Sequence, residues 1–236
     1  MNILVSIKNV SKQFFRNRGD SNIFYPVNKA DLTLHTGEII VILGASGSGK
    51  TTLLNMISGI LTPSEGEVKI LGEDIYQMKD KYLSIFRNTN IGSIPQNQSP
   101  IYSLNVMENI LLPFTMYNKD KSKVKDKMEL ASKLVQILKI DDLNNIMPDE
   151  LSGGELRRMA IARALIMEPS IIIADEPTSD LDDSNTEIVL NVLKDYANKG
   201  NGIIIVTHDE KMTEFADTVY RMQSGILKGD SINESK

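Results

Sequence analysis

Apolar residues along this chain fall into three patterns: short continuous runs, stretches that alternate with polar residues, and helical repeats. The continuous runs at residues 39–43, 171–176 and 202–207 are typical of strands buried on both faces of a parallel sheet. A further short strand is predicted at residues 91–94, where Pro95 ends it because proline cannot donate to a central ladder. Together these runs predict an α/β fold.

Alternating positions mark a second kind of strand. Residues 5–10 and 30–34 have the period of half-buried strands, and we expect them to form an antiparallel edge joined by a polar loop at residues 11–22. Residues 67–71 and 218–222 predict two more short strands. The core should therefore carry an antiparallel β subdomain near its N-terminus.

Helices are predicted by apolar spacings of three and four and by polar flanks. These segments are residues 79–88, 108–113, 122–140, 156–166 and 186–199. No strand pattern interrupts the chain between residues 97 and 150. We therefore expect one domain over residues 1–236, with an α/β core from residues 1–96 and 167–230 and an inserted all-α subdomain at residues 97–166.

A glycine-rich segment joins the first buried strand to the helix that follows it. It fits the phosphate-binding pattern G-x-x-x-x-G-K-[ST]. Its residues are Gly44, Ala45, Ser46, Gly47, Ser48, Gly49, Lys50 and Thr51, with Thr52 next in the helix. Glycines allow backbone N–H groups to close around phosphate oxygens at a helix N-terminus. Lys50 can reach the β- and γ-phosphates and the Thr51 hydroxyl can ligate Mg²⁺, so the segment predicts a P-loop NTPase.

Polar residues follow the other buried strands. Asp175 and Glu176 end the run at residues 171–176, and Gln96 and His208 follow two neighbouring strands. Because ligands bind at the carboxyl edge of parallel strands, we expect Asp175 to hold Mg²⁺ and Glu176 to orient or deprotonate the attacking water. Taken alone, Gln96 and His208 are more commonly solvated or structural residues; at the same edge as Lys50, His208 becomes a candidate γ-phosphate sensor.

Two further sites have both a functional and a structural interpretation. Ser152 stands at the N-cap of the helix at residues 156–166 and Glu155 at the capping-box position, which creates a helix start suited to anions but is also explained by capping alone. Phe14 and Phe15 lie in the polar segment at residues 11–22. An exposed ring there would stack on a nucleotide base, and the alternative is a ring that packs on the core.

Composition limits the class of protein. The chain has 236 residues, 41% of them hydrophobic and 24% charged, a net charge of −5 and no cysteine. These values exclude disulfides and thiolate metal sites, and they offer no global attraction to nucleic acid. No apolar stretch approaches the roughly 18–20 residues of a membrane span, and no signal sequence is evident, so we expect a cytoplasmic protein.

In their order along the chain, these motifs resemble those of the ATP-binding subunits of ABC transporters, and the resemblance covers essentially the whole sequence. The matching positions are Gln96 for the Q-loop, residues 151–155 for the signature sequence, Asp175 and Glu176 for the Walker B end, residues 179–182 for the D-loop and His208 for the switch histidine. Three positions depart from the common pattern: Glu155 replaces a more usual glutamine, Pro95 an aromatic residue, and the phenylalanines a tyrosine.

The resemblance implies a head-to-tail dimer, made of two copies or with a related ATPase, in which each ATP lies between the phosphate loop of one protomer and the signature of the other. Ser152, Gly153 and Gly154 would therefore act on the nucleotide of the partner. It also implies nucleotide contacts from Phe14 or Phe15, Glu155 and Asp182, and it places Gln96 with Thr51 and Asp175 at Mg²⁺.

The phrases GASGSGKTTLLN and ENILLP are most similar to a bacterial group that includes lipoprotein-releasing, macrolide-exporter and antimicrobial-peptide resistance ATPases. This implies an ATPase on the inner face of the cell membrane that powers separate permease subunits and moves a peptide, lipid-linked or hydrophobic substrate. The alternative is an ABC ATPase that regulates a membrane partner, as in cell division. Apolar residues within 99–114 predict a permease-binding surface, unless they pack inside the helical subdomain.

Overall fold

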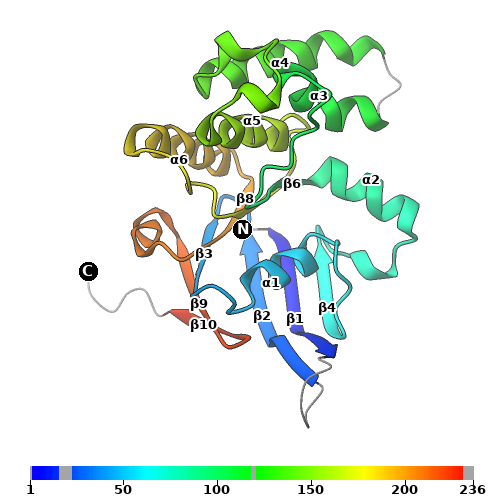
Figure 1. Ribbon diagram of the computed structural model, residues 1–236. Coiled ribbons are helices and arrows are strands. Elements are labelled where there is room, and N and C mark those ends of the chain that lie inside the picture. The colour runs from blue at the N-terminus through cyan, green and yellow to red at the C-terminus, as the bar shows by residue number, and fades with distance from the viewer. Residues whose placement is uncertain (1, 16–22, 118–120, 231–236) are drawn as a thin grey trace.

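The computed structural model describes residues 2–15, 23–117 and 121–230 (Figure 1). The strands are β1 (Ile3–Phe15), β2 (Ile23–His35), β3 (Ile39–Leu43), β4 (Glu65–Ile70), β5 (Glu73–Asp74), β6 (Ile91–Ile94), β7 (Ile171–Asp175), β8 (Gly202–Thr207), β9 (Thr218–Gln223) and β10 (Ile226–Asp230). The helices are α1 (Lys50–Ile57), α2 (Asp80–Asn90), α3 (Val106–Tyr117), α4 (Val124–Ile137), α5 (Gly153–Leu165) and α6 (Asp183–Asn198).

Two sheets organise these elements. The larger has six strands in the order β10-β9-β3-β8-β7-β6, in which β9, β3, β8, β7 and β6 run parallel and β10 is antiparallel to β9. The smaller has the order β2-β1-β4-β5 and is antiparallel. The predicted α/β core with an antiparallel β subdomain is therefore confirmed.

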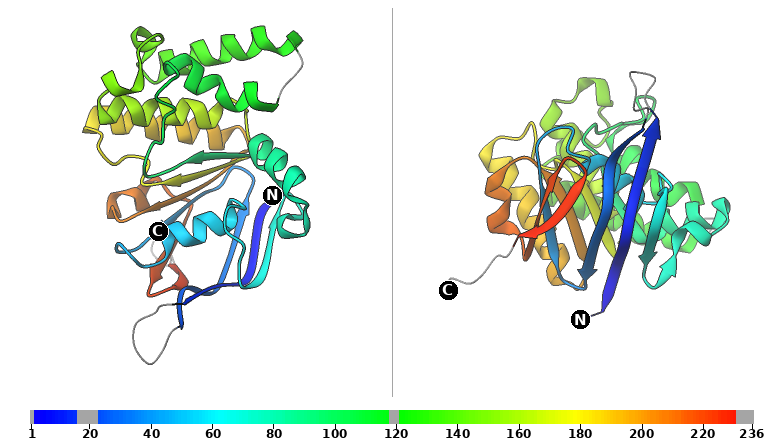
Figure 2. Two further views of the ribbon diagram at one scale, coloured as in Figure 1. Left: turned by 45° about the vertical axis from the view of Figure 1, so that its right-hand side comes forward. Right: turned by 90° about the horizontal axis from the view of Figure 1, so that it is seen from below.

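The larger sheet separates two hydrophobic cores. Successive side chains of a strand point to opposite faces, so Ile39, Val41 and Leu43 of β3 face one core and Ile40 and Ile42 face the other. Because both faces are covered, every residue of this strand is buried. On one side α1 lies between the two sheets, and on the other the sheet is covered by helices (Figures 1 and 2).

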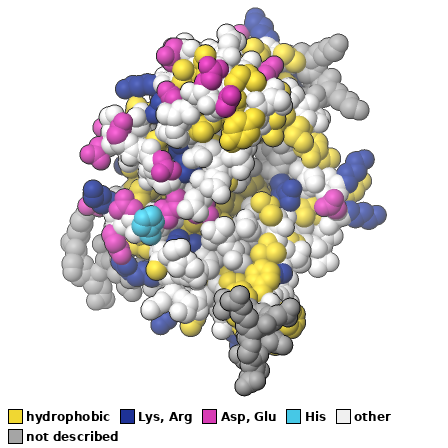
Figure 3. Space-filling view, in the orientation of Figure 1, with side chains coloured by type: hydrophobic (Ala, Val, Ile, Leu, Met, Phe, Trp, Pro, Cys, Tyr) yellow, Lys and Arg dark blue, Asp and Glu magenta, His cyan; other side chains and the backbone are white. Residues whose placement is uncertain are grey.

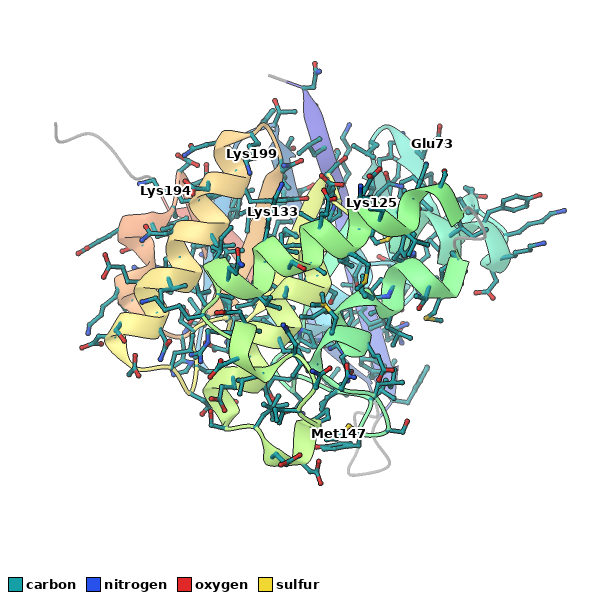
Figure 4. The ribbon with its side chains drawn as sticks, turned by 90° about the horizontal axis from the view of Figure 1, so that it is seen from above. Glu73, Lys125, Lys133, Met147, Lys194 and Lys199 are labelled. Atoms are coloured by element: carbon teal, nitrogen blue, oxygen red, sulfur yellow. The ribbon has the colours of Figure 1, made fainter. Side chains whose placement is uncertain are left out.

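Three helices of this layer, α3, α4 and α5, come from one stretch of chain between β6 and β7, as predicted for the inserted all-α subdomain, and α6 joins them from between β7 and β8. Val106, Ile110, Ala131, Val135 and Ile161 join it to the sheet in a shared core. Seen from above, α4 with Lys125 and Lys133 lies foremost in this layer, and α6 with Lys194 lies to one side of it (Figure 4). None of the helices in the described ranges is both long and apolar enough to span a bilayer.

Two local predictions are wrong. Residues 11–15, expected to be part of a loop at residues 11–22, instead belong to β1, which continues through Phe15 and pairs there with β2. The helix expected to end at Pro113 continues to Tyr117 as α3. In both places tertiary pairing or packing extends an element beyond the point where local sequence favours its end.

Candidate functional site

A cavity of about 490 Å³ opens at the carboxyl edge of the larger sheet. Its lining comes from the loop between β3 and α1, the first residues of α1, the ends of β6, β7 and β8, and one residue of β2. The lining residues are Pro26, Ala45, Ser46, Gly47, Gly49, Lys50, Thr51, Thr52, Gln96, Asp175, Glu176 and His208. The parallel register of β3, β8 and β7 brings the predicted residues of this set together, since it aligns the carboxyl ends of the three strands.

The glycine-rich loop wraps one wall of this cavity. Gly47 and Gly49 have φ angles of +79° and +112°, which a residue with a Cβ rarely adopts. A Cβ on Gly49 would also collide with the Pro26 carbonyl oxygen, so the loop requires glycine there. Lys50, 7% exposed, donates from Nζ to the carbonyl oxygens of Gly44 and Ala45 at 2.6 and 3.1 Å. The ammonium is thus held inside the curve of the loop.

Gly44 and Ser48 lie on the other side of the same loop. Both line a neighbouring hollow with Met222 and do not contribute to the lining of the main cavity. A Cβ on Gly44 would stand 2.5 Å from the Met222 carbonyl oxygen and 2.6 Å from Ser48 Oγ. These two residues therefore shape the loop from behind.

Thr51 and Asp175 meet at the base of the cavity. The Thr51 hydroxyl donates to Asp175 Oδ2 at 2.7 Å, and Asp175 is 7% exposed. Burial raises the pKa of Asp175, and the hydrogen bond from Thr51 acts in the opposite direction. A hydroxyl beside a buried carboxylate is a pair of hard oxygen donors, so these residues fit Mg²⁺ shared with phosphate oxygens. Among the described residues, no three acidic, histidine or cysteine side chains converge as a metal cluster.

Glu176 follows β7 with a φ angle of +51° and is 7% exposed. The Thr207 hydroxyl donates to its Oε2 at 2.7 Å, and the His208 backbone N–H donates to Oε1 at 3.1 Å. His208 Nδ1 lies 2.7 Å from the same Oε1, although the imidazole itself is largely exposed. The carboxylate is therefore aimed by the end of β8. Figure 3 shows a histidine among acidic side chains on this face.

The predicted capping box at the start of α5 is present. Glu155 N–H donates to Ser152 Oγ at 3.4 Å, and the Ser152 N–H and hydroxyl each donate to Glu155 Oε2 at 2.7 Å. These bonds, that of the hydroxyl foremost, lower the pKa of Glu155. With Gly153 and Gly154, the pair lies outside the lining of the main cavity. Within one chain, these residues therefore cap α5 and do not contact the main cavity.

Glu155→Ala should destabilise the protein by about 1 kcal/mol, which corresponds to ~2–4 °C in Tm for a chain of this size. Because folding lowers the pKa of Glu155 below its ordinary 4.5, its contribution is complete above that pH and is lost as the pH falls through the folded-state pKa. Thermal melts of both proteins at pH values from about 3 to about 7 measure this pH dependence. Parallel stability curves over the whole range would contradict it.

Asp182 and Phe14 have structural partners in place of cavity contacts. The Asp182 carboxylate caps α6, accepting from the Asn185 N–H at 2.8 Å. This bond is the main reason that the pKa of Asp182 is lowered. The Phe14 ring stacks on Phe24 with centroids 5.8 Å apart, and Lys12 Nζ lies 5.4 Å from its centroid. Neither residue lines the main cavity.

Sequence reasoning missed two residues of the site. Pro26 lines the cavity from β2, and nothing in its local sequence distinguishes it from other strand residues. Thr207 is 1% exposed and donates to Glu176. Its place at the end of a buried strand, just before His208, is the signal that would have identified it.

Comparisons with known proteins decide the family. The model of the ABC transporter family matches residues 27–179. The chain belongs to the ABC transporter family. Its sequence is 36% identical over 227 residues to the lipoprotein-releasing system ATP-binding protein LolD of Francisella tularensis, which covers 96% of each chain. It is 34% identical to the macrolide export ATP-binding/permease protein MacB of Chlorobaculum tepidum, covering 96% of this chain and 34% of that protein.

Similarity to solved structures supports the same family assignment. The ATP-binding cassette MJ0796, in a dimeric post-hydrolysis state bound to ADP and Pi, superposes with a TM-score of 0.88 at 31% identity, covering 96% of this chain and 98% of that one. This ABC protein is therefore an ATP-binding and ATP-hydrolysing subunit, and the predicted P-loop NTPase fold is confirmed. The resemblance to the lipoprotein-releasing and macrolide-exporter group is confirmed as well.

Proposed function

We propose that this ABC ATPase hydrolyses MgATP in the cavity at the sheet edge and thereby drives separate permease subunits that extract or export a lipid-linked, peptide or other hydrophobic substrate. Two observations carry the proposal. Five residues converge around one cavity: Lys50, Thr51, Asp175, Glu176 and His208. The chain also matches LolD over 96% of its length. Through its permease it would sit on the cytoplasmic face of the membrane. Residues 97–166 would form the lobe that receives the permease.

Each residue has a chemical role in this proposal. Lys50 and the backbone N–H groups of the loop hold the triphosphate. Glu176 accepts a proton from the attacking water while the water oxygen bonds to the γ-phosphorus and the bond from that phosphorus to the ADP oxygen breaks. His208 and Thr207 keep that carboxylate aimed at the cavity. Mg²⁺ held by Thr51 and Asp175, with Gln96 nearby, would neutralise charge on the phosphates.

The nucleotide site is completed by a second protomer in this proposal. Ser152, Gly153, Gly154 and Glu155 lie outside the cavity lining of their own chain, at a helix N-terminus suited to anions. A head-to-tail pair, of two copies or with a related ATPase, would bring this helix start to the γ-phosphate of the partner. The MJ0796 cassette is described as dimeric.

The proposal is tested by purifying a tagged version of this ATPase from detergent-solubilised membranes of its source cell. A permease should co-purify, and the preparation should hydrolyse ATP only with a divalent cation. Recovery with a membrane partner that transports no substrate would favour the regulatory alternative. An isolated chain that binds no ATP would contradict the nucleotide site itself.

Fewer residues of the proposed permease surface are exposed than the sequence indicated. Val106, Ile110 and Phe114 are buried, whereas Ile101 and Tyr102 are 43% and 63% exposed. Figure 3 shows hydrophobic side chains gathered over the helical part of this face. An exposed apolar pair on an ordered loop is typical of an interface.

That loop is held by one buried amide. Asn109 is 0% exposed, and its Nδ2 donates to the carbonyl oxygens of Ile101, Leu104 and Asn105 at 2.8–3.0 Å. Its Oδ1 accepts from the Ile101 N–H at 2.8 Å. The exposed pair is thus presented in one conformation, which lowers the entropic cost of binding.

Ile101→Asp combined with Tyr102→Asp should therefore reduce recovery of the permease at least about tenfold, the effect of losing ~1.4 kcal/mol or more at an apolar contact. ATP binding should be unchanged, because neither residue lines the cavity. Quantitative co-purification measures the loss. Ile226→Asp, a matched change at a 47% exposed isoleucine of β10, is the control. Equal recovery of the permease with both variants would place the contact elsewhere.

A further inference from the structure

Arg157 is a charged residue with no exposed surface in the middle of the chain's functional loops. It belongs to α5, whose first turn carries the capping box, and it is 0% exposed. Its Nη1 donates to the Pro95 carbonyl oxygen at 2.9 Å, and its Nη2 donates to the Gln96 carbonyl oxygen at 2.9 Å. The guanidinium therefore fixes the backbone that leads into and through Gln96.

The same Nη2 also reaches the loop that leaves the active-site strand. It donates to Ser179 Oγ at 2.7 Å, and the Ser179 hydroxyl in turn donates to the Glu176 carbonyl oxygen at 3.0 Å. Asp180 Oδ2 lies 3.9 Å from Nη2. One guanidinium thus links three segments that are far apart in sequence: α5, the loop at Gln96 and the loop after Glu176.

The buried charge of Arg157 makes its hydrogen bonds to the two loops costly to break. Burial lowers its pKa, and the charges of Asp180, Asp175 and Glu176 act against that shift. A buried cation is costly unless its hydrogen bonds are made, so any movement of one partner alone would leave part of this cost uncompensated. The three segments are therefore expected to move together.

Arg163, six residues further along α5, provides an internal comparison. Its Nη1 and Nη2 donate to the carbonyl oxygens of Ser99 and Gln98, at 3.1 Å in the case of Ser99. No hydrogen bond that it makes reaches the loop after Glu176 within the described part of the chain. Both arginines donate to backbone carbonyl groups of the loop at residues 95–99. Of the two, only Arg157 also donates to the loop that follows Glu176.

We propose that Arg157 is a positioning residue that couples the loop at Gln96 to Glu176, so that displacement of this loop, as by a docked permease, shifts the carboxylate through Ser179. The inference rests on the proposed function, since it assigns the base to Glu176. Through this link, the state of the permease-facing loop sets the geometry of hydrolysis without altering the cradle around the triphosphate.

Hydrogen exchange and steady-state kinetics of the whole chain test the coupling. Arg157→Met should accelerate amide exchange about tenfold at residues 96–99 and at residues 178–182, because both loops lose their donor. Arg163→Met should do so at residues 96–99 alone, and Ser179→Ala at residues 178–182 alone. With MgATP, Arg157→Met and Ser179→Ala should each lower kcat about tenfold with KM within about twofold, and the double variant should lose no more than either.

Three outcomes would overturn the inference: faster exchange of Arg157→Met at residues 96–99 only, an unchanged kcat, or multiplicative losses in the double variant. If Arg157→Met does not fold, Ser179→Ala and Arg157→Lys decide, since the lysine keeps the charge but donates from a single nitrogen and lacks the planar fork whose Nη1 and Nη2 reach acceptors on separate loops. Failure of the proposed function is separate: a wild-type chain that does not hydrolyse MgATP would remove the kinetic test while the exchange pattern still decides whether the loops are coupled.

Discussion

Glu176→Gln is expected to bind MgATP as the wild type does and to hydrolyse it about 10²–10⁴-fold more slowly, the range that a general base contributes. Glutamine keeps the shape of the side chain and an oxygen that can accept from the His208 N–H, while its amide nitrogen can donate to the Thr207 hydroxyl oxygen. What it lacks is the negative charge that takes the proton of the attacking water. Phosphate release under saturating MgATP measures the loss.

Because ATP is then trapped, Glu176→Gln should also convert from monomer to dimer when MgATP is added. Light scattering after size-exclusion chromatography measures this shift. Addition of Ser152→Arg, which places a long side chain at the exposed start of α5, should abolish it. Turnover at the wild-type rate would move the base to another residue. An inactive, ATP-saturated monomer would leave the base in place and point to a partner ATPase.

Lys50→Ala is expected to weaken ATP binding about 10- to 100-fold, the effect of removing hydrogen bonds from a charged donor to phosphate. The ammonium lines the cavity from a site that is 7% exposed, so water cannot replace it fully. Titration with a fluorescent ATP analogue measures the change in Kd.

Lys133→Ala, at an exposed lysine of α4, is the matched control and should bind ATP as the wild type does (Figure 4). Since Lys50 Nζ also donates to the carbonyl oxygens of Gly44 and Ala45, a thermal melt must accompany the titration. A folded Lys50→Ala variant with wild-type affinity for ATP would remove the assignment of the phosphate loop.

Local sequence accounts for much of the site because its chemistry is attached to strand ends. Lys50, Asp175, Glu176 and His208 each follow a continuous apolar run, and buried parallel strands can be recognised from such runs alone. Once the strands are parallel neighbours, their carboxyl ends meet at one edge, whatever the loops do. The position of the cavity was therefore predictable before any contact was known.

Elements bounded by long-range pairing were less predictable. The sequence indicates a polar loop from Ser11, yet β1 continues to Phe15, where Phe14 is opposite Phe24 of β2. Polar residues with modest strand propensity form a strand when a partner strand supplies the hydrogen bonds. Likewise, Val106 and Tyr102 look equally apolar in sequence, and only packing against the sheet separates the buried residue from the exposed one.

Sequence patterns alone predict the fold class, the phosphate loop, the capping box of α5 and the acidic strand end, because each depends on a short stretch of residues and on local interactions. Three features follow only from the packed fold: Pro26 completes the cavity, Thr207 holds Glu176, and Arg157 joins α5 to two loops. The hydrogen bonds of Arg157 connect residues 22 to 62 positions apart in the chain, and Pro26 lies on a strand without a motif. How the layers pack sets these distances.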